Sequence, residues 1–228
     1  MCGRYVAALH PDALVEEFEI STTPVERLTA DYNVAPTKKV YLVAERKENG
    51  TSVNALEVAR WGLIPSWSKD RSRASSMINA RVETVAEKPS FRSAFAKRRC
   101  LIPASGYYEW SGTQKQPFYI HAADDAPLAM AGLYEWWRDA SVAEPDPRAW
   151  IMTCTIITTS ASVDLAQIHD RMPVMVARGD RPAWLDPTRG GHEALAGIRT
   201  PVPLAVYPVS TAVNKVSNNG PDLTLDQG

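Results

Sequence analysis

The sequence has few cysteines and no long apolar run. Its 228 residues include three cysteines, Cys2, Cys100 and Cys154, which are too scattered for a disulfide framework and lack the C-x-x-C spacing of a zinc site. No apolar run approaches the ~18 residues that a membrane helix needs, and the first residues do not form a secretory signal. We therefore expect a cytoplasmic protein in a reducing setting, with no metal and no cofactor.

Long helices are also excluded, because 17 prolines interrupt the chain. Strand-like segments dominate, including 39–45 and 51–61 with Glu48-Asn49-Gly50 as the turn between them. Short helices are predicted at 11–20, 90–99, 160–168 and 192–198, and a mobile loop at 139–148. Helices and strands do not alternate regularly. The sequence therefore predicts an α+β fold, a strand-rich single domain over residues 1–228 with mostly antiparallel pairing.

The net charge of −1 hides an uneven distribution. Nine basic residues lie between positions 69 and 99 against three acidic ones, so this segment carries +6 and the rest of the chain −7. A basic segment of this kind is typical of a protein that binds a polyanion. The alternative is a solvated basic face, which is common in soluble proteins.

Position two carries a cysteine whose chemistry depends on Met1. The initiator methionine is commonly removed before a small residue, and removal leaves Cys2 with an α-amine and a thiol on adjacent carbons. Their ordinary pKa values are ~7.7–8.0 and ~8.5. The neutral amine can form a Schiff base with an aldehyde, and the thiol can then close a thiazolidine ring intramolecularly. The alternative is a cysteine buried as a small hydrophobic residue.

Further motifs follow this N-terminal MCGRY in a fixed order. They are YNVAPT (32–37), RWGLIPSW (60–67), INARVET (78–84), RCLIPASGYYEW (99–110), TTSAS (158–162), IHDRMPV (168–174) and YPVSTAVN (207–214). This set resembles the SOS response-associated peptidase (SRAP) domain family, whose bacterial and human members cross-link to abasic DNA. The resemblance spans essentially the whole chain, and it implies a barrel-like sheet with short helices around it.

The resemblance also implies roles for four residues. Cys2 would be the covalent residue and Asn79 would hold the N-terminal residue or its adduct. Glu109 would transfer protons as the sugar ring opens and intermediates collapse, and His169 would bond the ring oxygen or its hydroxyl. The family name implies a peptidase activity, which would match self-removal of the residues before the cysteine or a related hydrolytic release step.

Elementary chemistry agrees with these roles, because a carboxylate and an imidazole can divide acid and base work. Burial beside aromatic neighbours is expected to raise the pKa of Glu109. Each residue also has a simpler interpretation. Glu109 could face outward from a half-buried strand, His169 could be a helix cap or a surface residue, and Asn79 could lie in a turn.

DNA binding needs contacts to phosphates and to the bases beside the abasic site. Arg4, Arg81 and Arg171 lie inside the motifs, so phosphate contacts are expected from them within a basic DNA-contacting segment at about 60–99. Trp67 and Pro36 are expected to stack on a neighbouring base, whereas the alternative for Trp67 is core packing. The chain departs from the family pattern at position 68, where Ser replaces a second aromatic residue.

The predicted function is covalent capture of abasic sites in single-stranded DNA through Cys2, by a monomer that acts on the nucleoid. Two alternatives remain open from the sequence. One is an N-terminal-cysteine amidohydrolase that attacks an amide. The other is a module that binds single-stranded DNA without a covalent bond and in which the cysteine is incidental.

Overall fold

A computed structural model describes residues 2–112, 115–143 and 145–228. The strands are β1 (Arg4–Ala7), β2 (Ile20–Thr22), β3 (Asp31–Val34), β4 (Lys39–Glu48), β5 (Thr51–Trp61), β6 (Asn79–Arg81), β7 (Arg99–Ala104), β8 (Gly106–Ser111), β9 (Gln116–Ala122), β10 (Leu128–Arg138), β11 (Trp150–Ser160), β12 (Arg171–Pro173) and β13 (Leu204–Pro208). The α-helices are α1 (Pro11–Glu17), α2 (Arg92–Lys97), α3 (Arg181–Leu185) and α4 (Gly191–Ala196). Within these described ranges, no helix is long and apolar enough to cross a membrane.

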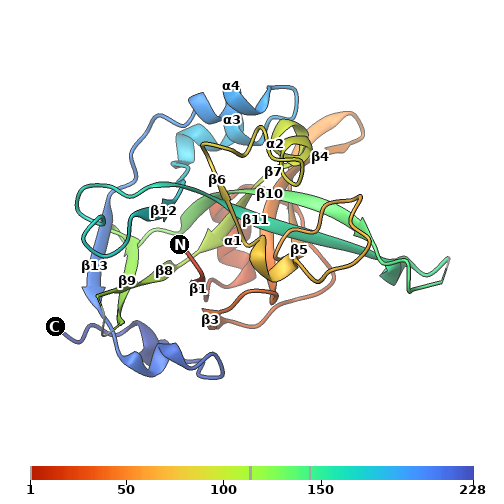
Figure 1. Ribbon diagram of the computed structural model, residues 1–228. Helices are drawn as coiled ribbons and strands as arrows, with labels where there is room; N and C mark the ends of the chain where they lie inside the picture. The colour runs from red at the N-terminus through yellow and green to blue at the C-terminus, as the bar shows by residue number, and fades with distance from the viewer. Residues whose placement is uncertain (1, 113–114, 144) are drawn as a thin grey trace.

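Two sheets build the molecule (Figure 1). The smaller sheet has the order β13-β9-β8-β1-β3, and the larger has the order β12-β11-β10-β7-β4-β5-β2, with β6 paired to β11. A parallel pairing of β11 with β5 places Thr153 opposite Arg60 and closes the strands β4, β5, β11, β10 and β7 into a ring. The predicted strand-rich α+β fold with a barrel-like, mostly antiparallel sheet is therefore confirmed.

Local sequence explains most of the elements. Asn49 and Gly50 join β4 to β5 with φ angles of 49° and 84°, a left-handed pair typical of the tightest hairpin turns, so the predicted turn is confirmed. The predicted helix at 160–168 is wrong. Strand β11 continues to Ser160, and the Ala161 N–H bonds the carbonyl of Asp170, so the chain turns back to place β12 beside β11. The loop at 139–148 joins β10 to β11, but residue 144 lies outside the described residues and the loop's mobility stays a prediction.

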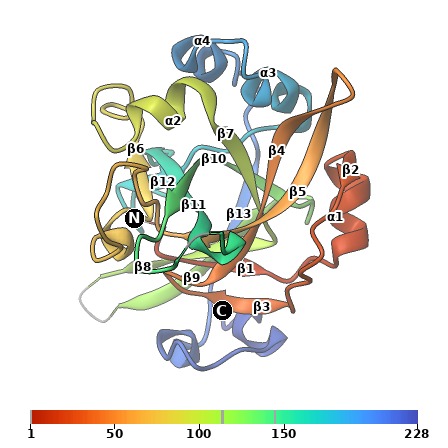
Figure 2. The same cartoon turned by 90° about the vertical axis from the view of Figure 1, so that its right-hand side faces the viewer.

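The core has two main parts. One lies within the ring and against the smaller sheet, and it includes Cys2, Tyr5, Trp61 and Tyr107. The other lies under α2, α3 and α4, which gather over one end of the barrel, and it extends to α1 at the side of the barrel (Figure 2). The start of the chain is thus part of the first core, so the residues that follow Met1 are held by packing.

Arg99 shows that the basic segment is not one continuous surface. It is 3% exposed at the start of β7. Its guanidinium donates to carbonyl oxygens at the ends of α2 and α3 and in the loop after α3, namely those of Phe95, Ala96, Trp184, Asp186 and Arg189. A cation at the end of a helix complements the helix dipole, as the sequence predicts for 90–99. Arg99 therefore joins two helices and cannot contact DNA.

Arg99→Met is expected to destabilise the fold by roughly 3–5 kcal/mol, because several buried carbonyl groups lose a charged donor at once. Urea unfolding measures the change. Arg98→Met is the matched control, since Arg98 is a neighbouring, more exposed arginine that bonds Glu135 at 2.6 Å. If Arg99→Met lowers the free energy of unfolding no more than Arg98→Met does, Arg99 does not hold α2 and α3 together.

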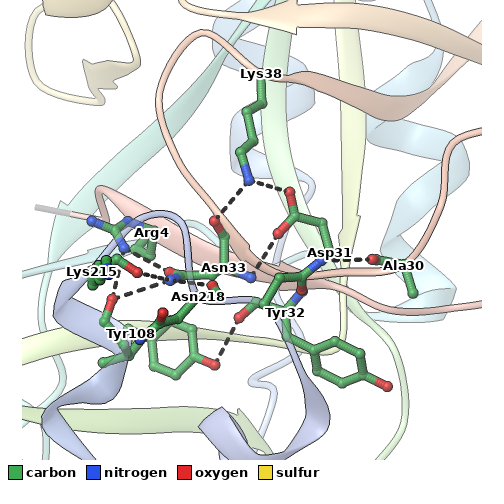
Figure 3. A network of polar contacts seen from close by, with 11 residues as sticks. Arg4, Ala30, Asp31, Tyr32, Asn33, Lys38, Tyr108, Lys215 and Asn218 are labelled. Carbon is green, nitrogen blue, oxygen red and sulfur yellow. Dashed lines mark hydrogen bonds and ion pairs between the residues drawn. The ribbon is translucent and has the colours of Figure 1, made fainter.

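Asn33 connects three of the sequence motifs in space (Figure 3). Its side chain is fully buried on β3. Its amide oxygen accepts a hydrogen bond from Arg4 Nη1 at 2.6 Å. Its amide nitrogen donates to the carbonyls of Val213, Lys215 and Asn218 at 3.0–3.2 Å. MCGRY, YNVAPT and YPVSTAVN therefore meet at one buried amide, which fastens the C-terminal segment to the first strand.

Candidate active site

Segments that are distant in the sequence meet at the start of the chain. In both views the segment that leads into β1 lies beside β6, β8 and β12 (Figures 1 and 2). Strand β8 pairs with β1, with Tyr107 opposite Tyr5. Strands β6 and β12 both pair with β11, so the larger sheet carries them to the same place. The four residues expected at the site lie on or next to these elements.

Cys2 lies at the centre of this region and is fully buried. The side-chain nitrogen of Asn79 donates a hydrogen bond to the Cys2 carbonyl oxygen at 2.8 Å. Burial, with a further contribution from the charge of Glu109, raises the pKa of the Cys2 thiol. The sulfur is therefore protonated at neutral pH and needs a base before it can act as a nucleophile.

Glu109 is the acidic group of the site. It is 3% exposed on β8, so the outward-facing alternative is wrong. Burial raises its pKa from 4.5 to about 7, and the charge of Asp170 acts in the same direction. A carboxyl group of this kind is protonated in part of the molecules at neutral pH. It can therefore both donate and accept a proton during a reaction.

The protonation state of His169 depends on neighbours that act in opposite directions. The backbone N–H of Arg171 donates to His169 Nδ1 at 3.0 Å, which requires a lone pair on that nitrogen. The Asp170 carboxylate lies 2.9 Å from the same nitrogen and would favour a proton there. Burial lowers the pKa of His169, which favours the neutral ring and the backbone bond. The ring proton then lies on Nε2, where it can be donated to a substrate oxygen.

Trp67 follows β5 and is 65% exposed, so the core-packing alternative is wrong. The next residue explains how this segment is held, because Trp137 Nε1 donates to the Ser68 carbonyl at 2.7 Å. Arg81 is exposed at the end of β6, two residues after Asn79 and thus on the same face. Pro36 is partly buried between β3 and β4, and its base contact stays a prediction.

The other two arginines expected at phosphates already have protein partners. Arg171 donates to both carboxylate oxygens of Glu83, at 2.6 and 2.9 Å, and to the Thr158 carbonyl. Arg4 bonds Asn33 and the Val213 carbonyl. Their phosphate contacts stay predictions. The exposed part of the basic segment consists of Lys69, Arg71, Arg73, Arg81, Lys88, Arg92 and Lys97.

A family model described as SOS response associated peptidase (SRAP) matches residues 1–216. The chain belongs to this family. The abasic site processing protein YoqW of Bacillus subtilis is 38% identical over 230 residues, which cover 98% of each chain. The abasic site processing protein YedK of Escherichia coli is 31% identical over 237 residues, again 98% of each chain. The abasic site processing protein HMCES of Gallus gallus is 34% identical over 230 residues, which cover 86% of this chain and 66% of its own length.

The SRAP fold is also found in solved structures. A crystal structure of a protein from Bacteroides thetaiotaomicron superimposes with a TM-score of 0.84 at 25% identity, and the match covers 99% of each chain. The arrangement of strands described above is therefore that of an experimentally known fold.

Two further residues of this SRAP site have little sequence signal of their own. Trp61 is fully buried and donates from Nε1 to the Ile78 carbonyl at 3.0 Å, which fixes the residue before Asn79. Its ring meets that of Tyr5 edge-on at 5.2 Å. Tyr107 lies two residues before Glu109 and is also fully buried. Both occur inside motifs, but only the tertiary structure brings them to the site.

Proposed function

We propose that this SRAP protein captures abasic sites in single-stranded DNA as a thiazolidine on Cys2, after Met1 has been removed, and so protects the damaged strand. One observation carries the proposal. Asn79 holds the backbone of Cys2 at 2.8 Å beside a buried carboxyl group with a pKa of about 7. The names of the relatives, abasic site processing proteins, support the same substrate.

The reaction needs an acid in one step and a base in the next. The Cys2 amine adds to the C1′ aldehyde of the open sugar, and protonated Glu109 gives its proton to the departing water, which leaves a protonated imine. The Glu109 carboxylate then takes the thiol proton, the sulfur–C1′ bond forms, and the C=N electron pair returns to nitrogen. His169, with its proton on Nε2, donates to the sugar ring oxygen as the hemiacetal opens. The net change is loss of one water.

The state of the thiol separates this function from an amidohydrolase. Direct attack on an amide needs a thiolate, whereas the raised pKa of Cys2 keeps the sulfur protonated. The amine-first route needs no thiolate until the imine is in place. The peptidase activity in the family name would correspond to one self-removal of the residue before Cys2. That event differs from turnover of free amides, because the amide is already next to the sulfur and Glu109 can take the thiol proton as the sulfur–carbon bond forms.

The test uses a single-stranded oligonucleotide with one abasic site and a matched intact strand. After denaturation, a band of reduced mobility is expected with the abasic strand only. The adduct mass should equal protein without Met1 plus DNA minus one water. Equal binding of both strands without a stable band would favour the non-covalent module, and an adduct that retains Met1 would exclude the amine chemistry.

Trp67→Ala is expected to weaken binding of single-stranded DNA roughly 5- to 150-fold, because one stacked base contributes ~1–3 kcal/mol. Fluorescence anisotropy with a labelled strand measures the affinity. The cross-linking rate at saturating DNA should stay close to that of the wild type. Trp136→Ala is the control, since Trp136 is a 40% exposed tryptophan on β10. Equal weakening by both variants would argue against a stacking role for Trp67.

A further inference from the structure

Tyr107 carries a buried hydroxyl group without a hydrogen-bond partner among the residues that the structure describes. Its side chain is fully buried on β8. The hydroxyl oxygen makes no hydrogen bond with any residue in the described part of the chain. Buried polar groups are normally bonded, so an unpaired one calls for a reason beyond folding. Because Tyr107 and Glu109 are two residues apart in one strand, their side chains lie on the same face.

Tyr107 belongs to the same buried core cluster as Cys2, and it shares one face of β8 with Glu109. Burial raises the pKa of Tyr107, and the charges of Cys2 and Glu109 raise it further, so the phenol lies within the electrostatic reach of both. The phenol therefore keeps its proton throughout the working pH range. It is a permanent hydrogen-bond donor beside a thiol and a carboxyl group.

The neighbouring tyrosines differ from Tyr107. Tyr108 has its hydroxyl satisfied, because it donates to the Tyr32 carbonyl at 2.9 Å, and its side chain lies on the opposite face of β8. Tyr5 pairs with Tyr107 across the two strands and also has an unpaired hydroxyl. After burial, however, the first charge that acts on Tyr5 is that of Cys154, and its ring packs against Trp61. Of these three tyrosines, Tyr107 is the one whose pKa is raised by the charges of both Cys2 and Glu109.

We propose that the Tyr107 hydroxyl donates a hydrogen bond to the Cys2 sulfur during closure of the thiazolidine ring. The inference rests on the proposed function and adds a residue to its second step only. In that step the Glu109 carboxylate removes the thiol proton, the sulfur–C1′ bond forms, and the C=N pair returns to nitrogen. Tyr107 keeps its own proton and stabilises the negative charge that develops on sulfur. Amine addition and loss of water do not involve it.

Tyr107→Phe tests this directly, because only the hydroxyl group is removed. Thiazolidine formation is expected to slow about 10²- to 10³-fold, as loss of one preorganised donor does in other sites. The imine should form at the wild-type rate and accumulate, so borohydride should trap more reduced adduct than with the wild type. The unfolding temperature should be equal or higher, since a buried group without a partner has been removed.

Two variants serve as controls. Tyr108→Phe loses the bond to Tyr32, so it should lower the unfolding temperature and leave the cross-linking rate unchanged. Cys2→Ala should give only adduct that depends on borohydride, which calibrates the imine assay. Ring closure at the wild-type rate in Tyr107→Phe would overturn the inference, as would equal slowing of imine and ring formation. If the wild type forms no adduct with abasic DNA, the proposed function itself fails.

Discussion

Cys2→Ala is expected to reduce the denaturation-stable adduct with abasic DNA at least about 100-fold, because the ring-closing step has no intramolecular thiol. Alanine is also small, so ordinary processing still removes the initiator methionine and leaves a terminal amine, although self-removal through the thiol is no longer available. The variant can therefore form an imine, but the imine hydrolyses when the protein is denatured. The measurement is the fraction of a single-stranded abasic oligonucleotide that stays shifted on a denaturing gel.

The chain offers matched controls for this result. Cys100 and Cys154 are free and fully buried like Cys2, so Cys100→Ala and Cys154→Ala should keep the wild-type amount of adduct. An N-terminal extension that is not removed should abolish the adduct although Cys2 is present, because the amine is then blocked. A stable adduct in the extended protein would show that the amine is not the reacting group.

Glu109→Gln is expected to slow cross-linking about 10²- to 10⁴-fold, the range associated with loss of one general acid–base group. Wild-type Glu109 has a pKa of about 7, so the rate should be highest near neutral pH, where acid and base forms coexist. Glutamine cannot titrate, and the variant's rate should change much less between about pH 5 and 8. Single-turnover cross-linking at saturating DNA measures both effects.

Glu109→Gln is expected to slow the reaction but to increase the stability of the fold at high pH. The folded-state pKa of Glu109 is raised from 4.5 to about 7, so its contribution to stability is complete below pH 4.5 and is lost as the pH rises through 7. Above pH 7, Glu109→Gln should therefore be more stable than the wild type, by at most about 3 kcal/mol. Thermal unfolding at pH 4 and pH 8 measures this difference.

Glu135→Gln is the control for removal of a buried carboxylate elsewhere. Glu135 is 8% exposed and bonds Arg98 at 2.6 Å, so its loss should lower stability and leave the cross-linking rate unchanged. If Glu109→Gln lowers both rate and stability, Glu109 is a structural residue and the proton-transfer role is wrong.

Local patterns predicted the fold better than they predicted the surroundings of single residues. The Asn49-Gly50 turn and the helix ending in basic residues follow from short-range backbone and capping preferences, and both are confirmed. The helix expected at 160–168 failed because pairing of β12 with β11 determines the path there. The sequence also could not show that Arg99 is buried, since its partners in and after α3 lie more than 80 positions away.

The amino-acid sequence by itself determined the chemical groups and their order: a cysteine at position two, followed by Asn79, Glu109 and His169 within recognisable motifs. Only the tertiary structure decided what those groups can do. The pKa of Glu109, the protonated thiol of Cys2 and the unpaired hydroxyl of Tyr107 all arise from burial against residues brought from other strands. Desolvation depends on everything that surrounds a group, and most of those neighbours are remote in the chain.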